Sequence, residues 1–291
     1  MFVVIGAGGF LGSQLIKSIL ENTDENVIAA ARSENFFGFG NDRVVPCIGD
    51  VCDRNYLDRL IGEINNAGNA DIIYTVACHN IDFVAENPDV AEKMNTQIPE
   101  YFTKGIKSFN KLFFTSSDTV YGDSNSHLFR ENDELNPVSI YGRQKAEGEK
   151  IFNAIGGTAL RLPLMFSESV SPAKKHFCDT VSESLENGRV IQLSKGFLRS
   201  ALDYETVAEL ILKLCELPEI PAILNISGDE SLSKYDLGLM LARKLSADKN
   251  LVEAAEFWGE FRSGAERADC TLMDNSLLKK ILGIGSIRIK L

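Results

Sequence analysis

Short apolar runs alternate with longer amphipathic stretches through the first half of the chain. The runs are typical of buried strands, and the stretches carry apolar residues at helical spacing. This alternation predicts an α/β fold with a doubly wound parallel sheet and helices on both of its faces. Strands are predicted at residues 2–5, 27–31, 44–48, 72–76, 112–115 and 158–162, and helices at 10–20, 54–65, 88–108 and 138–155.

The pattern changes after about residue 163. A polar stretch at 167–175 precedes a set of less regularly spaced elements. Helices are predicted at 177–187, 205–217 and 234–245, and strands at 190–193 and 222–226. We therefore expect a first domain at 1–165 and a smaller α/β C-terminal lobe at 166–291. Because no clean linker separates them, elements at about 190–226 are expected to interleave with the first domain.

Composition excludes some classes of partner. Hydrophobic residues make up 44% of the chain and charged residues 24%, as in ordinary globular proteins. Asp and Glu number 41 against 30 Lys and Arg, for a formal net charge of −11. Nucleic acids and anionic membranes need a positive protein surface, so neither is expected as a partner. A local basic pocket for one anionic ligand is compatible with this charge.

Neither a membrane span nor a metal centre is predicted. No apolar run approaches 18 residues, and the run at 2–5 is too short for a signal peptide. None of the six cysteines forms a C-x-x-C pair and the three histidines lie far apart, which gives zinc little support. We expect reduced thiols and a cytoplasmic location.

A glycine-rich turn follows the first predicted strand and opens the first predicted helix. Gly6, Gly9 and Gly12 stand at three-residue intervals, with Phe10 and Leu11 between the last two. In such loops one glycine makes the tight turn, one lets the backbone approach a pyrophosphate, and one lets helix and strand pack closely. The helix N-terminus adds free N–H groups and a partial positive charge. This position in the chain favours a dinucleotide site over the alternative, a turn without a ligand.

The end of the second predicted strand bears on which dinucleotide binds. NAD sites usually have Asp or Glu there to hold the ribose 2′-hydroxyl, but this strand ends with Ala31, Arg32 and Ser33. Arg32 can pair with a 2′-phosphate. NADP(H) is therefore favoured as the cofactor. NAD(H) is the alternative, with Arg32 as a solvated charge and Glu34 at the ribose.

Two segments carry groups suited to proton transfer. Ser117 closes a strand, while Tyr141 and Lys145 lie four residues apart and share one face of a helix. A lysine ammonium beside a phenol lowers the pKa of the tyrosine, which becomes an acid or base near neutrality. The Ser117 hydroxyl would hydrogen-bond a substrate oxygen. The Tyr–Lys spacing alone occurs by chance, but together with the glycine loop and the serine it predicts catalysis.

These features together resemble the extended short-chain dehydrogenase/reductases, the NAD-dependent epimerase/dehydratase superfamily. The residues that carry the resemblance are the loop at 6–12, Asp50, the segment at 76–78, Ser117, Tyr141, Lys145 and the strand at 160–163. The resemblance covers most of the chain. It implies a Rossmann-type NAD(P)-binding domain at 1–165 and a substrate-binding C-terminal lobe.

The resemblance also implies a set of cofactor contacts. Asp50 would hydrogen-bond the adenine amino group, while Asp53 can cap the following helix at the same time. Lys145 would reach the nicotinamide ribose. The cofactor-binding residues expected are Gly6, Gly9, Phe10, Leu11, Gly12, Arg32, Asp50, Val51, Val76, Ala77, Cys78, Thr115, Tyr141, Lys145 and Pro163.

The most similar branch is that of the dTDP-4-dehydrorhamnose reductases. Similar segments are 78–82, 86–88 with Asn95, 117–120, 267–272, 274–276 and 282–284. The segment at 119–122 is instead closer to the sugar epimerases, and the fourth strand ends with Ala77 and Cys78 where the family often has two alanines. Nucleotide-sugar 4,6-dehydratases place an Asp-Glu pair after the serine or threonine. Here Thr119 follows Asp118, so dehydration is disfavoured.

Substrate is expected beyond the carboxyl ends of the strands, between the catalytic residues and the C-terminal lobe. Asp118 and Thr119 lead into this region. Arg199 falls where epimerase-like relatives bind the sugar-nucleotide pyrophosphate, and a surface arginine is the alternative. Some relatives use a histidine near His176 as an acid in epimerisation, and a structural histidine is the alternative.

The sequence therefore predicts an NADP(H)-dependent oxidoreductase or epimerase acting on a nucleotide sugar. Reduction of a 4-keto sugar, with Tyr141 as acid/base, is the leading hypothesis. The alternatives are a nucleotide-sugar 4-epimerase and a non-catalytic regulatory protein of the same fold, because the regulatory subunit of methionine adenosyltransferase resembles this branch too. Members of this class often pair through helices at positions matching 88–108 and 138–155, which suggests a homodimer.

Overall fold

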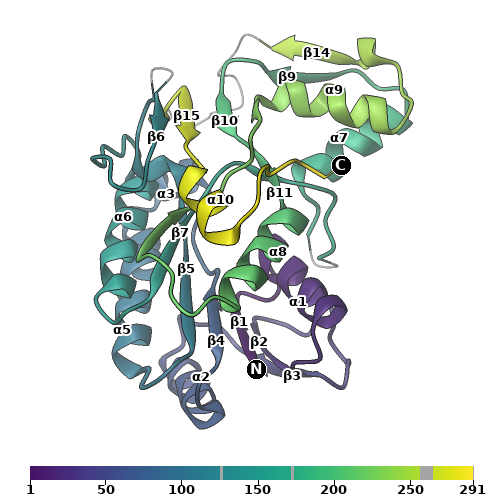
Figure 1. The fold of residues 1–291 in the computed structure, drawn as a ribbon. Helices are drawn as coiled ribbons and strands as arrows, with labels where there is room; N and C mark the ends of the chain where they lie inside the picture. The colour runs from purple at the N-terminus through teal and green to yellow at the C-terminus, as the bar shows by residue number, and fades with distance from the viewer. Residues whose placement is uncertain (125–126, 172–173, 256–264, 291) are drawn as a thin grey trace.

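A seven-stranded parallel sheet forms the centre of the computed structural model, which describes residues 1–124, 127–171, 174–255 and 265–290 (Figure 1). The strand order is β12-β7-β5-β4-β1-β2-β3. The strands are β1 (Phe2–Ile5), β2 (Val27–Ala31), β3 (Val44–Ile48), β4 (Asp71–Tyr74), β5 (Lys111–Ser117), β7 (Thr158–Leu162) and β12 (Ile223–Asn225). All neighbours run parallel, which confirms the predicted doubly wound sheet. The order reverses between β1 and β4, and ligands bind at such a point, beyond the carboxyl ends of the strands.

Helices cover both faces of this sheet. In β1, Phe2 and Val4 pack in one hydrophobic cluster while Val3 and Ile5 pack in another. The first cluster includes α1 (Phe10–Asn22) and α8 (Tyr204–Cys215), and the second includes α2 (Arg54–Ala67), α5 (Ile98–Gly105) and α6 (Ile140–Asn153). Because both faces are buried, the strands appear in the sequence as continuous apolar runs.

The helix predicted at 88–108 is divided in the structure. Helix α4 (Pro88–Glu92) leads into a π-helical turn (Lys93–Gln97) and then into α5. Pro99 lacks the N–H that an α-helix would direct at the carbonyl of Asn95, so the backbone widens before the proline. The side chain of Asn95 is buried within this turn.

The region after β4 also differs from the prediction. The strand ends at Tyr74 rather than at residue 76, and a short helix that was not predicted, α3 (Ile81–Glu86), follows. The side chain of Asn80 caps this helix by accepting the N–H of Phe83. Residues 75 and 76, which were predicted to end the strand, instead line a cleft described below.

The second half of the chain builds a smaller lobe above the carboxyl edge of the sheet (Figure 1). Its core joins α7 (Phe177–Glu186) and α9 (Lys234–Lys244) to the paired strands β9 (Ile191–Ser194) and β14 (Val252–Ala255). The structure also contains a four-stranded sheet of order β13-β10-β15-β6 and the pair β8–β11. In Figure 1, β6 and β15 stand beside the lobe, above the main sheet. The strands of these two sheets are β6 (Leu128–Phe129), β8 (Met165–Phe166), β10 (Leu198–Ser200), β11 (Leu202–Asp203), β13 (Ser231–Leu232) and β15 (Cys270–Met273). The elements not yet named are the helix α10 (Ser276–Leu282) and 3₁₀ turns at Asp118–Val120 and Lys249–Leu251.

The chain returns from the lobe to the main sheet. Strand β12 pairs with β7 at the sheet edge, and α8 packs against α1. The boundary expected at 165 stays a prediction, but α8 and β12, which lie beyond it, belong to the layers of the sheet. Neither β15 nor α10 was predicted.

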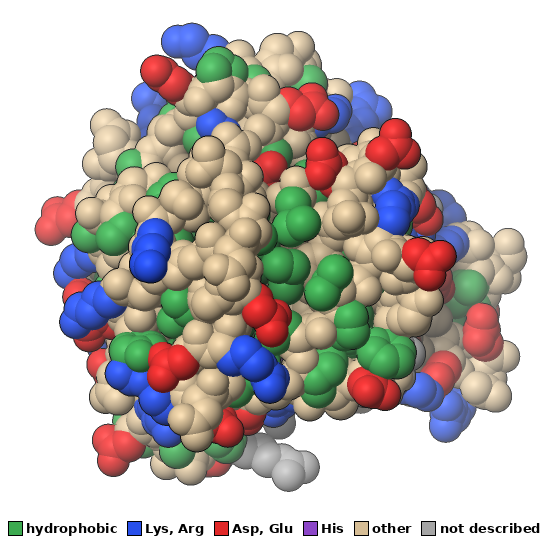
Figure 2. Space-filling model, turned by 90° about the horizontal axis from the view of Figure 1, so that it is seen from below, with side chains coloured by type: hydrophobic (Ala, Val, Ile, Leu, Met, Phe, Trp, Pro, Cys, Tyr) green, Lys and Arg blue, Asp and Glu red, His purple; other side chains and the backbone are tan. Residues whose placement is uncertain are grey.

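The surface carries mixed charge on the face seen from below. Acidic and basic side chains are interspersed there, with hydrophobic side chains gathered to one side of the centre (Figure 2). Within the described ranges, no helix is long and apolar enough to cross a membrane.

Candidate active site

One cleft of about 1160 Å³ brings together the residues predicted for the site. It lies at the carboxyl ends of the strands, between the sheet and the C-terminal lobe. The predicted residues that line it are Gly6, Gly9, Phe10, Leu11, Gly12, Arg32, Asp50, Val51, Val76, Ala77, Cys78, Thr115, Ser117, Asp118, Thr119, Tyr141, Lys145, Pro163, His176 and Arg199. This volume is at or above the usual upper size of a pocket for one small ligand. The individual roles given to these residues stay predictions.

The glycine loop has the form that an anionic ligand needs. Gly6 has a φ of +102°, and a Cβ at Gly12 would lie 2.2 Å from the carbonyl oxygen of Gly6, so neither position accepts a side chain. Helix α1 begins with Gly9 at its N-cap, without a capping side chain or an acidic residue in its first turn. Its first N–H groups and partial positive charge therefore suit a pyrophosphate. The loop fits the predicted dinucleotide.

The cation predicted at the end of β2 lies on the cleft wall. Arg32 lines the cleft, whereas the exposed Glu34 is not among the lining residues. Lys174, which was not predicted, also lines the cleft, and burial followed by the Arg32 charge lowers the pKa of its ammonium. Asp50 accepts the N–H of Cys52, and Asp53 caps α2, so the two acids have separate local roles.

Helix α6 presents the tyrosine and the lysine to the end of β5. Lys145 is 2% exposed, and its Nζ donates to the carbonyl oxygen of Thr115 at 2.7 Å. Its Nζ lies 5.8 Å from the centre of the Tyr141 ring. Burial lowers the pKa of Lys145 to about 7, and the charge of Glu149 opposes this shift.

The pKa of Tyr141 moves in the direction opposite to the prediction. Burial raises it, and the charges of Asp118 and Cys78 raise it further. The structure therefore does not support the predicted lowering of this pKa by Lys145. The ammonium is directed at the Thr115 carbonyl, and its own proton is weakly held.

Three side chains form a hydrogen-bonded chain where β5 ends. The Ser117 hydroxyl donates to Asp118 Oδ1 at 3.0 Å and accepts from the hydroxyl of Thr119 at 3.0 Å. Asp118 is 4% exposed, and its second oxygen, Oδ2, accepts no hydrogen bond among the described residues. Burial raises the pKa of this carboxyl, against the opposing charge of Arg199. The Arg199 guanidinium faces this oxygen at 3.6 Å, so the buried carboxylate has a cationic partner.

Arg199 and His176 are already bonded within the protein. The Arg199 guanidinium donates to the carbonyls of Leu198, Ala268 and Asp269, and its Nε lies 3.6 Å from Asp118 Oδ2. The His176 Nδ1 caps α7 by accepting the N–H of Cys178. Its ring packs 4.9 Å from Phe10 and 5.3 Å from Tyr204, centre to centre. This arrangement matches the structural alternative for His176.

Besides Lys174, the prediction assigned no role in the site to two further residues, the buried Asn95 behind the cleft and Arg267 on its wall. The Asn95 amide accepts from the N–H of Cys78 and donates to its carbonyl, which fixes the segment after β4. Arg267 lines the cleft and pairs with Asp82 at 2.8 Å. Asn95 and the segment at 267–272 were noted only as points of family resemblance, because their partners lie far away in the sequence.

Comparison with known proteins places this geometry in a family. A family model described as "RmlD substrate binding domain" matches residues 1–289. Among related proteins, the beta subunit of methionine adenosyltransferase 2 from Bos taurus is 26% identical over 249 residues, which cover 82% of this chain and 70% of the relative.

Two solved structures share the fold at low identity. The dTDP-4-dehydrorhamnose reductase (rfbD) from Bacillus anthracis, in complex with NADP, has a TM-score of 0.79 and 17% identity, over 98% of this chain and 94% of that one. MoeE5, in complex with UDP-glucose and NAD, has a TM-score of 0.78 and 19% identity, over 100% and 94%. With its nearly full-length family match, the chain belongs to the RmlD substrate binding domain family, within the extended short-chain dehydrogenase/reductases that its sequence resembles.

Proposed function

We propose that this protein is an NADP(H)-dependent reductase of a 4-keto nucleotide sugar. The observation that carries the proposal is the convergence of Ser117, Tyr141 and Lys145 on the cleft that the glycine loop also lines. One structural neighbour is a dTDP-4-dehydrorhamnose reductase bound to NADP, and another holds UDP-glucose. The cleft is large enough for a dinucleotide and a second ligand.

The residues support proton delivery in the direction of reduction. The nicotinamide would supply a hydride to the sugar carbon. Because the pKa of Tyr141 is raised, its phenol keeps its proton at neutral pH and can deliver it to the developing alkoxide. Ser117 would orient the substrate oxygen once its hydroxyl turns from Asp118. A protonated Lys145 would stabilise the phenolate that remains.

Two cations of the cleft, Arg32 after β2 and Lys174 before α7, support NADP(H) over NAD(H). Arg32 and Lys174 line the cleft, and no carboxylate of the 31–35 segment does. Their charges suit the 2′-phosphate that distinguishes NADP from NAD. MoeE5 holds NAD, so NAD(H) is the alternative that the test must address.

Titration with NADPH and NADH, followed by nicotinamide fluorescence, tests this assignment. We expect NADPH to bind more tightly, and Arg32→Ala to weaken NADPH binding by about 10-fold to 100-fold while NADH binding changes little. The matched control is Glu34→Ala, which should leave NADPH binding unchanged. A preference for NADH, lost in Glu34→Ala, would reverse the assignment and favour the 4-epimerase. Turnover of nucleotide-sugar ketones is then measured with the preferred cofactor.

A regulatory role is the second candidate, and the methionine adenosyltransferase subunits among the relatives favour it. In that case the protein would hold a nucleotide and serve a partner enzyme. Nucleotide binding without turnover of any nucleotide-sugar ketone would support this candidate over the reductase.

A further inference from the structure

A buried ion pair lies directly behind the catalytic side chains. Tyr141, Lys145 and Glu149 follow one another at four-residue spacing, so they share the face of α6 that packs on β5. Glu149 is 3% exposed and Arg161, on β7, is 1% exposed. The guanidinium binds the carboxylate through two nitrogens, Nε at 2.9 Å and Nη2 at 2.8 Å.

This pair connects the two elements that carry the catalytic groups. The Glu149 carboxylate accepts the hydroxyl of Ser116 at 2.6 Å, and Ser116 immediately precedes Ser117. Lys145 makes the second connection, to the Thr115 carbonyl one residue earlier on β5. The two bonds fix the position of α6 along the end of the strand, and hence the position of Tyr141 relative to Ser117.

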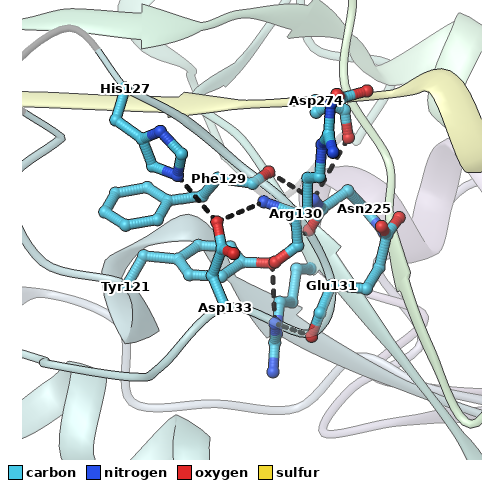
Figure 3. Close-up of polar contacts among 9 residues, drawn as sticks. Tyr121, His127, Phe129, Arg130, Glu131, Asp133, Asn225 and Asp274 are labelled. Carbon is cyan, nitrogen blue, oxygen red and sulfur yellow. Dashed lines mark hydrogen bonds and ion pairs between the residues drawn. The ribbon is translucent and has the colours of Figure 1, made fainter.

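Arg161 extends the connection towards Asn225 on the edge strand β12. Its Nη1 donates to the Tyr121 hydroxyl at 2.6 Å, and this hydroxyl donates to Asn225 Oδ1 at 2.7 Å. The Asn225 amide donates in turn to the carbonyls of Phe129 and Asp274 (Figure 3). The guanidinium is thus held on several sides and cannot follow a moving carboxylate.

The charges alternate along this line. Lys145 and Arg161 are buried cations, and the Glu149 carboxylate pairs with Arg161 while its charge also acts on Lys145. Other titratable groups lie around these side chains. The charges of Asp118 and Cys78 act on Tyr141, His79 senses the Lys145 charge, and Glu92 accepts the amide of Gln144. Tyr121 and Glu131 lie beside Arg161. Glu149 is the acid that opposes the loss of the Lys145 proton.

A buried ion pair is a poor device for stability alone, because desolvation offsets most of its attraction. We propose that Glu149 and Arg161 are a positioning pair, which holds Lys145 charged and fixes α6 against the end of β5 for proton transfer at Tyr141. The catalytic part of this role rests on the proposed function. The electrostatic part, which is the effect of the pair on the charge of Lys145, can be tested without a substrate.

The test is a pH titration of Lys145 in protein labelled at lysine Cε with ¹³C, with the resonance assigned through Lys145→Arg. Glu149→Gln should lower the pKa of Lys145 by about one unit or more, because the carboxylate charge is lost and the Arg161 charge stays. Arg161→Gln should raise it, because Glu149 then faces Lys145 alone. The double variant Glu149→Gln/Arg161→Gln should return it close to the wild-type value.

Opposite shifts of the Lys145 pKa in the two single variants would indicate an electrostatic role. A loosened fold would instead move this pKa in the same direction in both variants. The matched control is Glu147→Gln, an exposed residue of the same helix that pairs with Lys150 at 2.9 Å and should leave Lys145 unchanged. The proposal is overturned if Glu149→Gln leaves the pKa of Lys145 unchanged, or if both single variants shift it in the same direction. If one single variant does not fold, the direction of the Lys145 pKa shift in the other variant decides whether the proposal holds.

The same variants give an activity readout that tests the two proposals separately. With a turned-over substrate, Glu149→Gln should shift the alkaline limb of the kcat profile to lower pH, and Glu149→Asp should restore part of the shift. If no substrate is found, the proposed function fails while the lysine titration still reports on the pair. If turnover is found but the pKa of Lys145 does not shift in the variants, only the positioning role of Glu149 and Arg161 is refuted.

Discussion

The two walls of the cleft are built differently. The wall under the glycine loop presents backbone groups, because Gly9 leaves the first N–H groups of α1 without a capping side chain. The opposite wall presents long side chains, and Arg199 already donates to three carbonyls. A backbone cradle is specified by residues next to one another, whereas the partners of a long side chain depend on the whole fold. The first wall is therefore the easier one to predict from sequence.

The substitution Tyr141→Phe should separate chemistry from binding most strongly. It removes the proton donor and leaves the ring packing, so turnover should fall by about 10³-fold. NADPH binding, followed by nicotinamide fluorescence, should stay within about twofold of wild type because the glycine-loop wall is untouched. Turnover that survived this change would falsify the assignment of Tyr141.

The substitution Gly12→Ala should damage the glycine-loop wall. Its Cβ would meet the Gly6 carbonyl oxygen at 2.2 Å, so the loop must change shape, and NADPH affinity should fall by about 100-fold. Gly8→Ala is the matched control, since no atom lies within 4 Å of its Cβ position. Equal effects of the two substitutions on isothermal binding titrations would contradict the close-packing role of Gly12.

The substitution Arg199→Lys tests whether the internal hydrogen bonds of the opposite wall stabilise the protein. The lysine keeps the charge but cannot reach all the carbonyls, so the free energy of unfolding should fall by about 1–3 kcal/mol in urea denaturation. The exposed Arg189→Lys is the control and should be neutral. If stability is unchanged and only nucleotide-sugar affinity falls, then Arg199 serves the ligand as the sequence predicts, and the internal bonds are secondary.

The pH dependence of stability should report the buried Lys145. Between about pH 7 and pH 10.5 the unfolded chain keeps this proton while the folded protein releases it, so the free energy of unfolding rises with pH through that window. Below pH 7 both states hold the proton and the cost of burying the ammonium is largest. Lys145→Met should therefore stabilise the protein most at pH 6 and progressively less towards pH 10. A difference in melting temperature that did not change with pH would argue against the lowered pKa.

Local pattern predicted most of the main sheet, because its strands are buried on both faces and each apolar run is bounded by polar residues or glycines. The helix at 88–108 was predicted as continuous, but Pro99 lies in the first turn of α5, where a proline is tolerated, and the sequence does not show where that turn begins. The residues of the site were found through their spacing along the chain. Their partners were not: the segment that binds Arg199 lies about 70 residues away, and the charge that acts on Lys145 depends on burial.

The position of β15 has a consequence for synthesis of the protein on the ribosome. This strand pairs with β10 and with β6, and the Thr271 hydroxyl donates to the carbonyl of Gly122, 149 positions earlier. The glycine-loop wall lacks its packing until α8, which packs against α1, has been made, whereas the opposite wall is incomplete until residues 270–273 leave the exit tunnel. A nascent chain is therefore expected to acquire nucleotide binding before it can hold a second ligand, and to gain the second capacity only after residues 270–273 have emerged.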